Sequence, residues 1–305
     1  MTVTAGVRMV PVRTAAGDFR VWTRQAGSSA TTKVLVLHGG PGATHEYLLS
    51  LEEPLVAAGF EVWFYDQLGS HHSDQPDDPS LWEIPRFVDE VEQVRVALCL
   101  DRDDFVLYGQ SWGGVLAIEY ALAHQQHLKG LVISNMMASV PAYNAYAEQV
   151  LMPTMDQDVL AEITRLEAAG ETNDPTYEAL LMEHHYVHHV LRRPADQWPP
   201  EVVAGFAHIN QAIYVPLQGP SELGASGKLL HWDRSGDLPR ITVPTLVIGA
   251  QHDTMDPEYL RWMARQLPRG RYLHCPDGSH LAMVDDHEVY VAGFVDFLGD
   301  LESAP

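Results

Sequence analysis

A short apolar stretch that turns abruptly into a helix constrains the fold of this chain more than any other feature. Residues 105–108 read Phe-Val-Leu-Tyr, which is typical of a buried strand, and residues 111–124 have the composition of a helix. Between them, residues 109–113 read Gly-Gln-Ser-Trp-Gly and match the pattern G-x-S-x-G. The glycines are required because a side chain at either position would clash in so tight a turn. This arrangement predicts a nucleophile elbow, which presents the hydroxyl of Ser111 above the sheet.

Further apolar runs of strand length alternate with helical segments. They occupy residues 34–37, 61–65, 131–134, 245–249 and 271–274, and a helical spacing covers residues 87–100. Short apolar strands that alternate with helices predict a parallel sheet covered on both faces. Near the start of the chain, residues 9–13 and 19–23 predict a β-hairpin with a Gly-Asp turn at residues 17–18. The predicted fold class is α/β, with a mostly parallel central sheet flanked by helices.

The alternation stops in the middle of the chain. Residues 136–238 are rich in Met, Tyr, His and Pro, are helical in pattern and contain no clear buried strand. We expect them to form a helical cap inserted between two strands of one sheet. The core would then consist of residues 1–135 and 239–305.

A serine hydroxyl is inert at neutral pH unless a base takes its proton, so a histidine and an acid are expected later in the chain. Asp253 follows the apolar run 245–249, and His280 follows the run 271–274. Both fall at the carboxyl ends of predicted strands, where open α/β sheets place their sites. We predict that Ser111 is the nucleophile, that His280 is the general base and acid, and that Asp253 orients the imidazole.

Other histidines and acids compete for these roles, since the chain has sixteen histidines. His274 would lie inside a strand, and His287 would lie on the helix that follows. Asp256 is the rival acid, but Pro257 after it suggests that this aspartate begins a helix. These positions favour His280 and Asp253.

The loop at residues 38–42 reads His-Gly-Gly-Pro-Gly and follows the first apolar run. Acyl transfer requires two backbone N–H donors for the oxyanion. One should come from Trp112, the residue after the nucleophile, and the other from this early loop. Pro41 has no N–H, so Gly40 is the predicted donor and Gly39 is the second choice.

These segments together resemble the proline iminopeptidases (prolyl aminopeptidases), serine peptidases of the α/β-hydrolase fold. The matching pieces are residues 38–42, 65–70 (Tyr-Asp-Gln-Leu-Gly-Ser), 109–114, the loop that carries Asp253, and 278–280 (Gly-Ser-His). The pair HGGPG and GxSWGG is specific to this group. The resemblance implies release of an N-terminal residue, often proline, from short peptides, amides or arylamides.

In that family, carboxylates hold the free amine of the substrate, since an ammonium group in a dry pocket needs a paired anion. One such glutamate lies in a Gly-Pro-x-Glu segment, which residues 219–222 match. The resemblance therefore implies that Glu222 binds the amine, that Tyr214 lines the site, and that Gly39 lies beside the substrate. The family's second glutamate follows the catalytic aspartate, where this chain has Thr254. That departure leaves an L-amino-acid amidase and a small-substrate esterase or lactonase open as alternatives.

Residues 183–189 read Glu-His-His-Tyr-Val-His-His. On a helix, His184 with His188 and His185 with His189 are paired at the spacing that can hold zinc. The zinc-protease pattern needs glutamate at the position of His185, and the two pairs point in different directions. We therefore expect no metal here and no cofactor elsewhere, because a serine triad needs neither.

The charge and the cysteines narrow the expected partners. Nineteen basic against 41 acidic residues give a net charge of −22, which disfavours nucleic acid and anionic membranes as partners. The first eight residues have no apolar core of the kind that a signal peptide carries, and two cysteines cannot build a disulfide framework. We expect a cytoplasmic protein whose partner is a small peptide or amino-acid amide; the sequence leaves the oligomeric state open.

One further hypothesis is a binding protein that kept a hydrolase fold without turnover, because fold alone does not prove function. The complete triad and both oxyanion elements argue against it.

Overall fold

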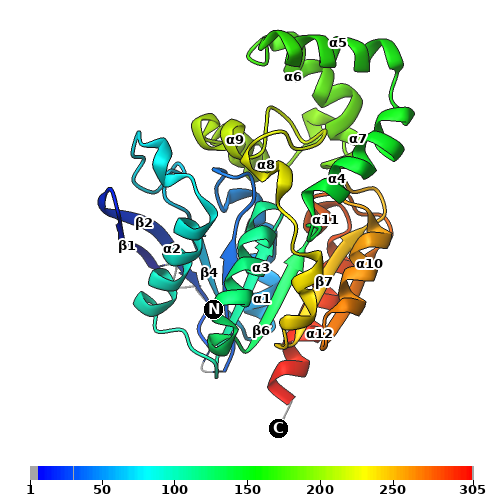
Figure 1. The fold of residues 1–305 in the computed structure, drawn as a ribbon. Helices are drawn as coiled ribbons and strands as arrows, with labels where there is room; N and C mark the ends of the chain where they lie inside the picture. Colours follow the sequence, from blue (N-terminus) through cyan, green and yellow to red (C-terminus); the bar gives the residue numbers. More distant parts are fainter. Residues whose placement is uncertain (1–5, 30, 304–305) are drawn as a thin grey trace.

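The computed structural model describes residues 6–29 and 31–303, and it shows one sheet with helices on both faces (Figure 1). The sheet has eight strands in the order β1-β2-β4-β3-β5-β6-β7-β8. The strands are β1 Gly6–Thr14, β2 Gly17–Ala26, β3 Lys33–Leu37, β4 Glu61–Asp66, β5 Phe105–Gln110, β6 Gly130–Ser134, β7 Thr245–Ala250 and β8 Gly270–Cys275. All neighbours from β4 to β8 run parallel, while β1 and β2 join as an antiparallel ribbon. The predicted α/β class with a mostly parallel sheet is confirmed.

Each predicted strand of the parallel part is present and extends one or two residues beyond its apolar run. The expected hairpin turn is wrong by two positions. Thr14 pairs with Gly17, so the turn consists of Ala15 and Ala16, and the Gly-Asp pair begins β2. Residues 1–5, where no signal peptide is predicted, lie outside the described residues.

Helices cover the sheet because successive side chains of each strand point to opposite faces. Leu35 and Leu37 of β3 join the apolar cluster under helices α2, α3 and α10, whereas Val34 and Val36 join the cluster under α1 and α12. The helices of the core are α1 Glu52–Ala57, α2 Ile84–Ala97, α3 Trp112–His124, α10 Pro257–Gln266, α11 Ala282–Asp285 and α12 His287–Ser303.

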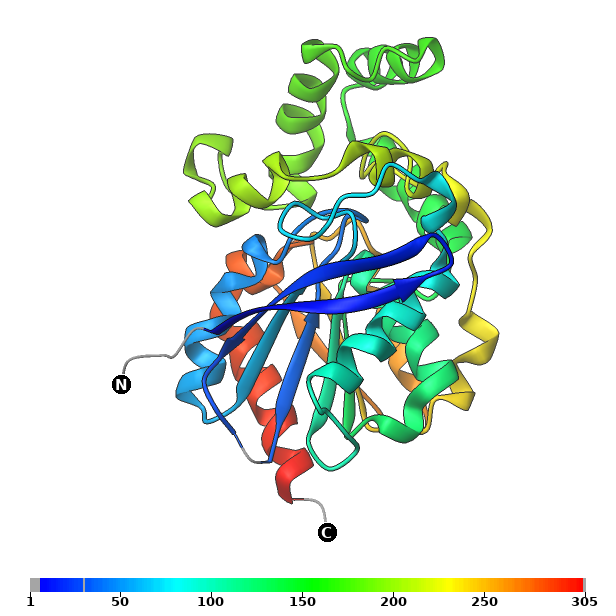
Figure 2. The ribbon, with the colours of Figure 1, turned by 90° about the vertical axis from the view of Figure 1, so that its left-hand side faces the viewer.

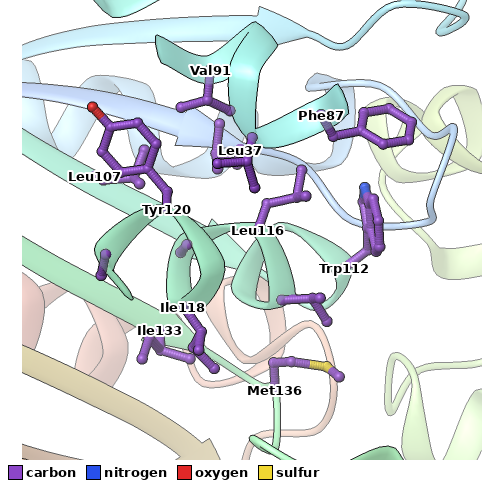
Figure 3. Close-up of a cluster of buried hydrophobic side chains, with 14 of the residues drawn as sticks. Leu37, Phe87, Val91, Leu107, Trp112, Leu116, Ile118, Tyr120, Ile133 and Met136 are labelled. Atoms are coloured by element: carbon purple, nitrogen blue, oxygen red, sulfur yellow. The ribbon is translucent and has the colours of Figure 1, made fainter. Parts of the chain in front are cut away.

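Helix α3, which follows the predicted elbow, is held by large apolar side chains (Figure 3). Leu116 of this helix is fully buried in the same cluster as Leu37 and Leu107 of the sheet. At its first residue, the Trp112 ring meets the Phe87 ring edge-on, with 5.3 Å between centroids. This packing fixes the start of α3, and with it the serine that precedes the helix.

Most of the described chain between β6 and β7 is helical and lies above the carboxyl ends of the strands, while its last part, drawn in yellow, descends along the side of the sheet and its flanking helices to β7 (Figures 1 and 2). The α-helices of this segment are α4 Val140–Tyr146, α5 Gln157–Ala169, α6 Pro175–Leu181, α7 Val187–His189, α8 Pro200–Ala207 and α9 Gln211–Leu217. Side chains of Ser139, Asp156, Asp174 and Asn210 accept hydrogen bonds from the first turns of α4, α5, α6 and α9, which explains where these helices begin. None of the described helices has the length and apolarity to cross a membrane. A cytoplasmic location stays a prediction.

Candidate active site

Ser111 stands at the sharp turn between β5 and α3. Its backbone has φ 55° and ψ −125°, a conformation that costs free energy in a non-glycine residue and that clusters at functional sites. The neighbouring glycines permit this turn. A Cβ atom on Gly109 would lie 2.0 Å from the carbonyl oxygen of Gly113, and one on Gly113 would lie 2.3 Å from the carbonyl oxygen of Leu37.

Asp253 and His280 meet in the loops that follow β7 and β8. The Nδ1–H of His280 donates to Oδ1 of Asp253 over 2.8 Å. The Asp253 carboxylate is fully buried and also accepts the backbone N–H of Met255 at 3.1 Å. Burial opposes protonation of the His280 ring, but the adjacent carboxylate outweighs it, so the pKa of His280 lies above its ordinary value.

Ser111 and His280 line one cavity of about 600 Å³, which also contacts Gly40, Glu222 and Tyr214. Its walls come from the loops above the sheet and from residues of α6, α8 and α9, so it lies between the sheet and the helices above it. Cavities of this size hold small molecules. Because Nδ1 of His280 is bonded to Asp253, the free ring nitrogen is Nε2.

Gly40 and Trp112 keep their backbone N–H groups free in the described part of the chain, where neither donates to a protein acceptor. Both residues border the small recess beside Ser111. Gly40 has φ +101°, and a Cβ there would lie 2.7 Å from the nitrogen of Ala43. Gly39 differs, because its N–H donates to the Tyr47 hydroxyl at 2.6 Å. Of the two glycines, Gly40 therefore has the available donor.

Tyr47 and Gln110 were missed by the sequence analysis. The Tyr47 hydroxyl donates to Oε1 of Gln110 over 2.6 Å, and Nε2 of Gln110 donates to the His280 carbonyl oxygen over 3.0 Å. These two side chains connect the glycine loop, the elbow and the histidine loop. The only sequence signal was the position of Gln110 inside the G-x-S-x-G motif.

Glu222 carries a carboxylate toward the cavity that holds Ser111. Its Oε1 accepts the hydroxyl of Tyr214 at 2.6 Å, and its backbone carbonyl accepts the hydroxyl of Tyr143 at 2.7 Å. Burial raises the pKa of Glu222, while the charge of His280 and the Tyr214 hydrogen bond act in the opposite direction. Four tyrosines lie close enough for the charge of Glu222 to raise their pKa, in addition to the larger effect of burial: Tyr47, Tyr143, Tyr186 and Tyr214.

The rival candidates have structural positions away from this cavity in the described chain. Asp256 caps α10 by accepting the N–H of Glu258 at 2.9 Å. His274 lies in β8, and His287 begins α12 with its Nδ1 bonded to the carbonyl of Met283.

The comparisons with known proteins agree with this geometry. Residues 32–287 match the family described as the alpha/beta hydrolase fold. The chain is 49% identical to a proline iminopeptidase of Flavobacterium johnsoniae over 96% of its own length and 98% of that protein. It is 48% identical to one from Elizabethkingia meningoseptica, over 97% and 99% of the two chains. The chain belongs to the proline iminopeptidase family.

Solved structures show the same relationship. The crystal structure of the proline iminopeptidase of Mycobacterium smegmatis superposes with a TM-score of 0.85 at 30% identity, covering 97% of this chain and 99% of that one. The crystal structure of VinJ gives a TM-score of 0.89 at 32% identity, covering 96% and 99%.

Thr254 occupies the position at which this chain departs from the pattern of the family. It is fully buried beside Asp253 and His280. Its hydroxyl oxygen lies 3.2 Å from Nδ1 of His280 and donates to Oδ1 of Asp253 over 3.3 Å. The side chain therefore contacts the Asp253–His280 pair and contributes no carboxylate to the cavity.

The histidine run packs helices above the sheet onto the loops that carry Glu222 and His280. Residues Met182–Tyr186 form a π-helical turn, so the run is not one regular α-helix, although the rings of His185 and His189 still lie together with 5.2 Å between centroids. Nε2 of the buried His185 lies 3.2 Å from the Glu222 carbonyl oxygen, and burial lowers the pKa of His185 to about 3. The carbonyl of His189 accepts the backbone N–H of His280 at 2.9 Å. The run thus contacts both the glutamate loop and the histidine loop.

Proposed function

We propose that this chain is a serine aminopeptidase that releases an N-terminal amino acid, preferentially proline, from short peptides, amides and arylamides through an acyl-enzyme. The observation that carries the proposal is the cavity that holds Ser111, the Asp253-bound His280 and the Glu222 carboxylate together. The relatives that share nearly the whole chain at 44–49% identity are named proline iminopeptidases.

Acylation begins when Nε2 of His280 takes the proton of the Ser111 hydroxyl. The serine oxygen attacks the carbonyl carbon of the N-terminal residue, and the oxyanion accepts hydrogen bonds from the N–H groups of Gly40 and Trp112. Asp253 holds the imidazole in the tautomer with its proton on Nδ1 and stabilises the imidazolium. His280 then gives its proton to the leaving amine as the carbon–nitrogen bond breaks.

Deacylation repeats these roles with water as the nucleophile. His280 takes a proton from water, the hydroxide attacks the acyl carbon, and the proton returns to the oxygen of Ser111 as the ester bond breaks. The released amino acid leaves with its carboxylate and free amine.

Glu222 binds the amine of the substrate in this proposal. An ammonium group that leaves water needs an anion with charge-assisted hydrogen bonds, and Glu222 supplies one beside the nucleophile. The Tyr214 hydroxyl fixes the carboxylate through its 2.6 Å hydrogen bond. Apolar and aromatic residues of the cavity suit a pyrrolidine ring, among them Tyr186, Phe206 and Leu281.

The proposal includes the division of the chain into a core and a cap. Residues 1–135 and 239–305 would form the hydrolase core, and residues 136–238 would form the cap. The separate apolar cluster of Ile163, Leu166, Tyr177 and Leu181 within the helices above the sheet supports a cap with packing of its own.

A second candidate is an L-amino-acid amidase or a small-substrate esterase or lactonase of the same fold. The observation that favours it is Thr254, which leaves Glu222 without the second carboxylate of the family pattern. Comparison of a prolyl substrate with its N-acetylated form separates the esterase or lactonase from the other two enzymes, because only an aminopeptidase or an amino-acid amidase needs the free amine. Equal rates on both would identify an esterase-like enzyme.

The direct test is hydrolysis of proline p-nitroanilide and prolinamide by the purified protein. Ser111→Ala is expected to abolish turnover and labelling by a fluorophosphonate probe, with the fold retained by circular dichroism. Normal turnover by Ser111→Ala would refute the mechanism. Absence of both turnover and labelling in the unaltered protein would favour the binding-protein hypothesis.

A further inference from the structure

The second oxygen of the Asp253 carboxylate has a partner that the mechanism above does not use. Its Oδ1 faces His280, while its Oδ2 accepts Nδ2–H of Asn135 over 2.7 Å. The same amide nitrogen donates to the carbonyl oxygen of Ser279, the residue before His280, over 3.2 Å. One side chain at the end of β6 therefore contacts the loops of both the acid and the base.

Asn135 is itself held by a buried chain of hydroxyl groups. Its Oδ1 accepts the Ser134 hydroxyl at 2.7 Å, Ser134 Oγ lies 2.7 Å from the Tyr290 hydroxyl, and that hydroxyl lies 2.6 Å from the hydroxyl of Tyr108. All four of these residues are fully buried. They come from β5, β6, the residue after β6, and α12, so the sheet and one of its flanking helices hold them.

The negative charge of Asp253 decides which group donates and which accepts in this series of hydrogen bonds. An ionised carboxylate only accepts hydrogen bonds, so Asn135 must turn its NH₂ group toward Asp253 and its carbonyl oxygen toward Ser134. Ser134 then donates to Asn135 and accepts from Tyr290, and Tyr290 accepts from Tyr108. The three O–H groups and one N–H of the Asn135 amide then all point toward the carboxylate, and such aligned hydrogen bonds polarise one another in a buried site.

The backbone of Asn135 is also unusual. It has φ 52°, in the left-handed region that non-glycine residues rarely adopt, although asparagine tolerates it better than most. Its N–H donates to the carbonyl of Ile248 in β7 over 2.9 Å. This conformation directs the amide from the end of β6 to the loop after β7.

We propose that Asn135 is a positioning residue for the catalytic pair. Its amide holds the Asp253 carboxylate in the orientation that receives Nδ1–H of His280. The hydrogen-bonded hydroxyls of Tyr108, Tyr290 and Ser134 fix the amide. Only the kinetic part of the test below rests on the proposed function, because the imidazole can be observed without substrate.

Asn135→Gly is the most direct variant, because glycine adopts φ 52° without strain and removes only the side chain. We expect kcat for proline p-nitroanilide to fall about tenfold to a hundredfold, by analogy with the loss seen when a group that orients a metal-binding histidine is removed, with KM unchanged within about twofold. The inflection of kcat/KM on the acid side should move to higher pH, because a carboxylate that has lost a donor attracts the imidazole proton more strongly. The downfield proton NMR signal of His280 Nδ1–H should weaken or shift.

Two tyrosine variants serve as a matched pair. Tyr290→Phe removes one hydroxyl from the middle of the hydrogen-bonded series Tyr108–Tyr290–Ser134–Asn135. We expect it to lower kcat, but less than Asn135→Gly does. Tyr120→Phe removes a hydroxyl that donates to Glu92 over 2.7 Å and takes no part in this hydrogen-bonded series. It should leave kcat and the pH profile unchanged. Rates are normalised to the fraction of protein that fluorophosphonate labels at completion.

A purely structural role is distinguishable from positioning. If Asn135→Gly lowers the melting temperature while the folded enzyme keeps its kcat, its pH profile and its His280 signal, the proposal is overturned. Should Asn135→Gly fail to fold, Tyr290→Phe decides by the same criteria. If the unaltered protein cleaves no prolyl substrate, the proposed function fails, and the NMR comparison still tests the role of Asn135.

Discussion

The hydroxyl of Tyr214 donates to Oε1 of Glu222 over 2.6 Å inside the cavity that Ser111 lines. In a partly dry site this phenol–carboxylate pair fixes an anion at one place. The substrate amine and the reacting carbonyl of an N-terminal residue are separated by a single carbon. An anchor for the amine therefore also sets where the carbonyl lies relative to the serine oxygen.

Glu222→Gln is expected to lower kcat/KM for proline p-nitroanilide about 100-fold, equivalent to about 2.8 kcal/mol, because a buried ammonium loses its charged partner. Tyr214→Phe keeps the charge and loses one hydrogen bond, so a loss of about tenfold or less is expected. Steady-state kinetics on both variants check this. The N-acetylated substrate is the control, and a similar loss on it would show that Glu222 does not act through the amine.

The pH dependence follows from the pKa of His280, which the Asp253 carboxylate holds above its ordinary value against the opposing effect of burial. The imidazole must be neutral to take the serine proton. We therefore expect kcat/KM to rise with pH through an inflection above about 6.5, the ordinary value for histidine. Glu222, whose pKa burial raises, must also ionise to hold the amine, which steepens the fall in acid.

Asp253→Asn tests whether the Asp253 charge is what raises the pKa of His280. The variant removes the charge that raises the pKa of His280 and leaves the burial that lowers it. Its residual activity, about 10⁴-fold below normal when the tautomer is wrong, should show an inflection at lower pH. An unchanged inflection would mean that another group controls the profile.

Backbone sterics at the elbow give a stability prediction. A Cβ on Gly109 would lie 2.0 Å from the carbonyl oxygen of Gly113, an atom that cannot move without breaking the start of α3. Gly109→Ala is expected to lower the free energy of unfolding by about 3 kcal/mol or more, measured by urea denaturation. Gly236→Ala is the matched control, since a Cβ there meets no atom within 4 Å, and should change stability by less than about 0.5 kcal/mol. Equal stabilities would contradict the steric argument.

Local sequence signals predicted those parts of the site that depend on the chain next to them. The apolar run 105–108 and its glycines predicted the elbow, and the positions of Asp253 and His280 after two strands predicted their meeting. Contacts between distant residues had no such signal. Tyr47 reaches Gln110 across 63 positions, and Asn135 reaches Asp253 across 118. Such pairs depend on the strand order, which periodicity alone does not give.

The histidine run shows a different failure. On a regular helix, the sequence would pair His184 with His188 and His185 with His189. The structure contains a π-helical turn at Met182–Tyr186, and His185 is buried against the Glu222 loop. Burial against a loop 37 positions away decided its role, and no local pattern carries that information.

Thr254 stands where the family pattern has its second glutamate, and its role can be tested by removing its hydroxyl. The hydroxyl contacts His280 and Asp253, and the residue is fully buried outside the cavity lining among the described residues. Thr254→Val keeps the shape and removes the hydroxyl. We expect kcat to fall about tenfold or less, the value of one hydrogen bond, with KM for the free amine unchanged.

Thr245→Val is the matched control for this last prediction. Thr245 is equally buried, and its hydroxyl donates to the carbonyl of Val243 over 2.9 Å at the opposite end of β7. Its loss should reduce stability without changing kcat or KM. Thr254→Val could instead raise KM for prolyl substrates while kcat stays constant. That result would mean that the hydroxyl binds the amine and substitutes for the missing glutamate, and it would contradict a role beside His280 and Asp253.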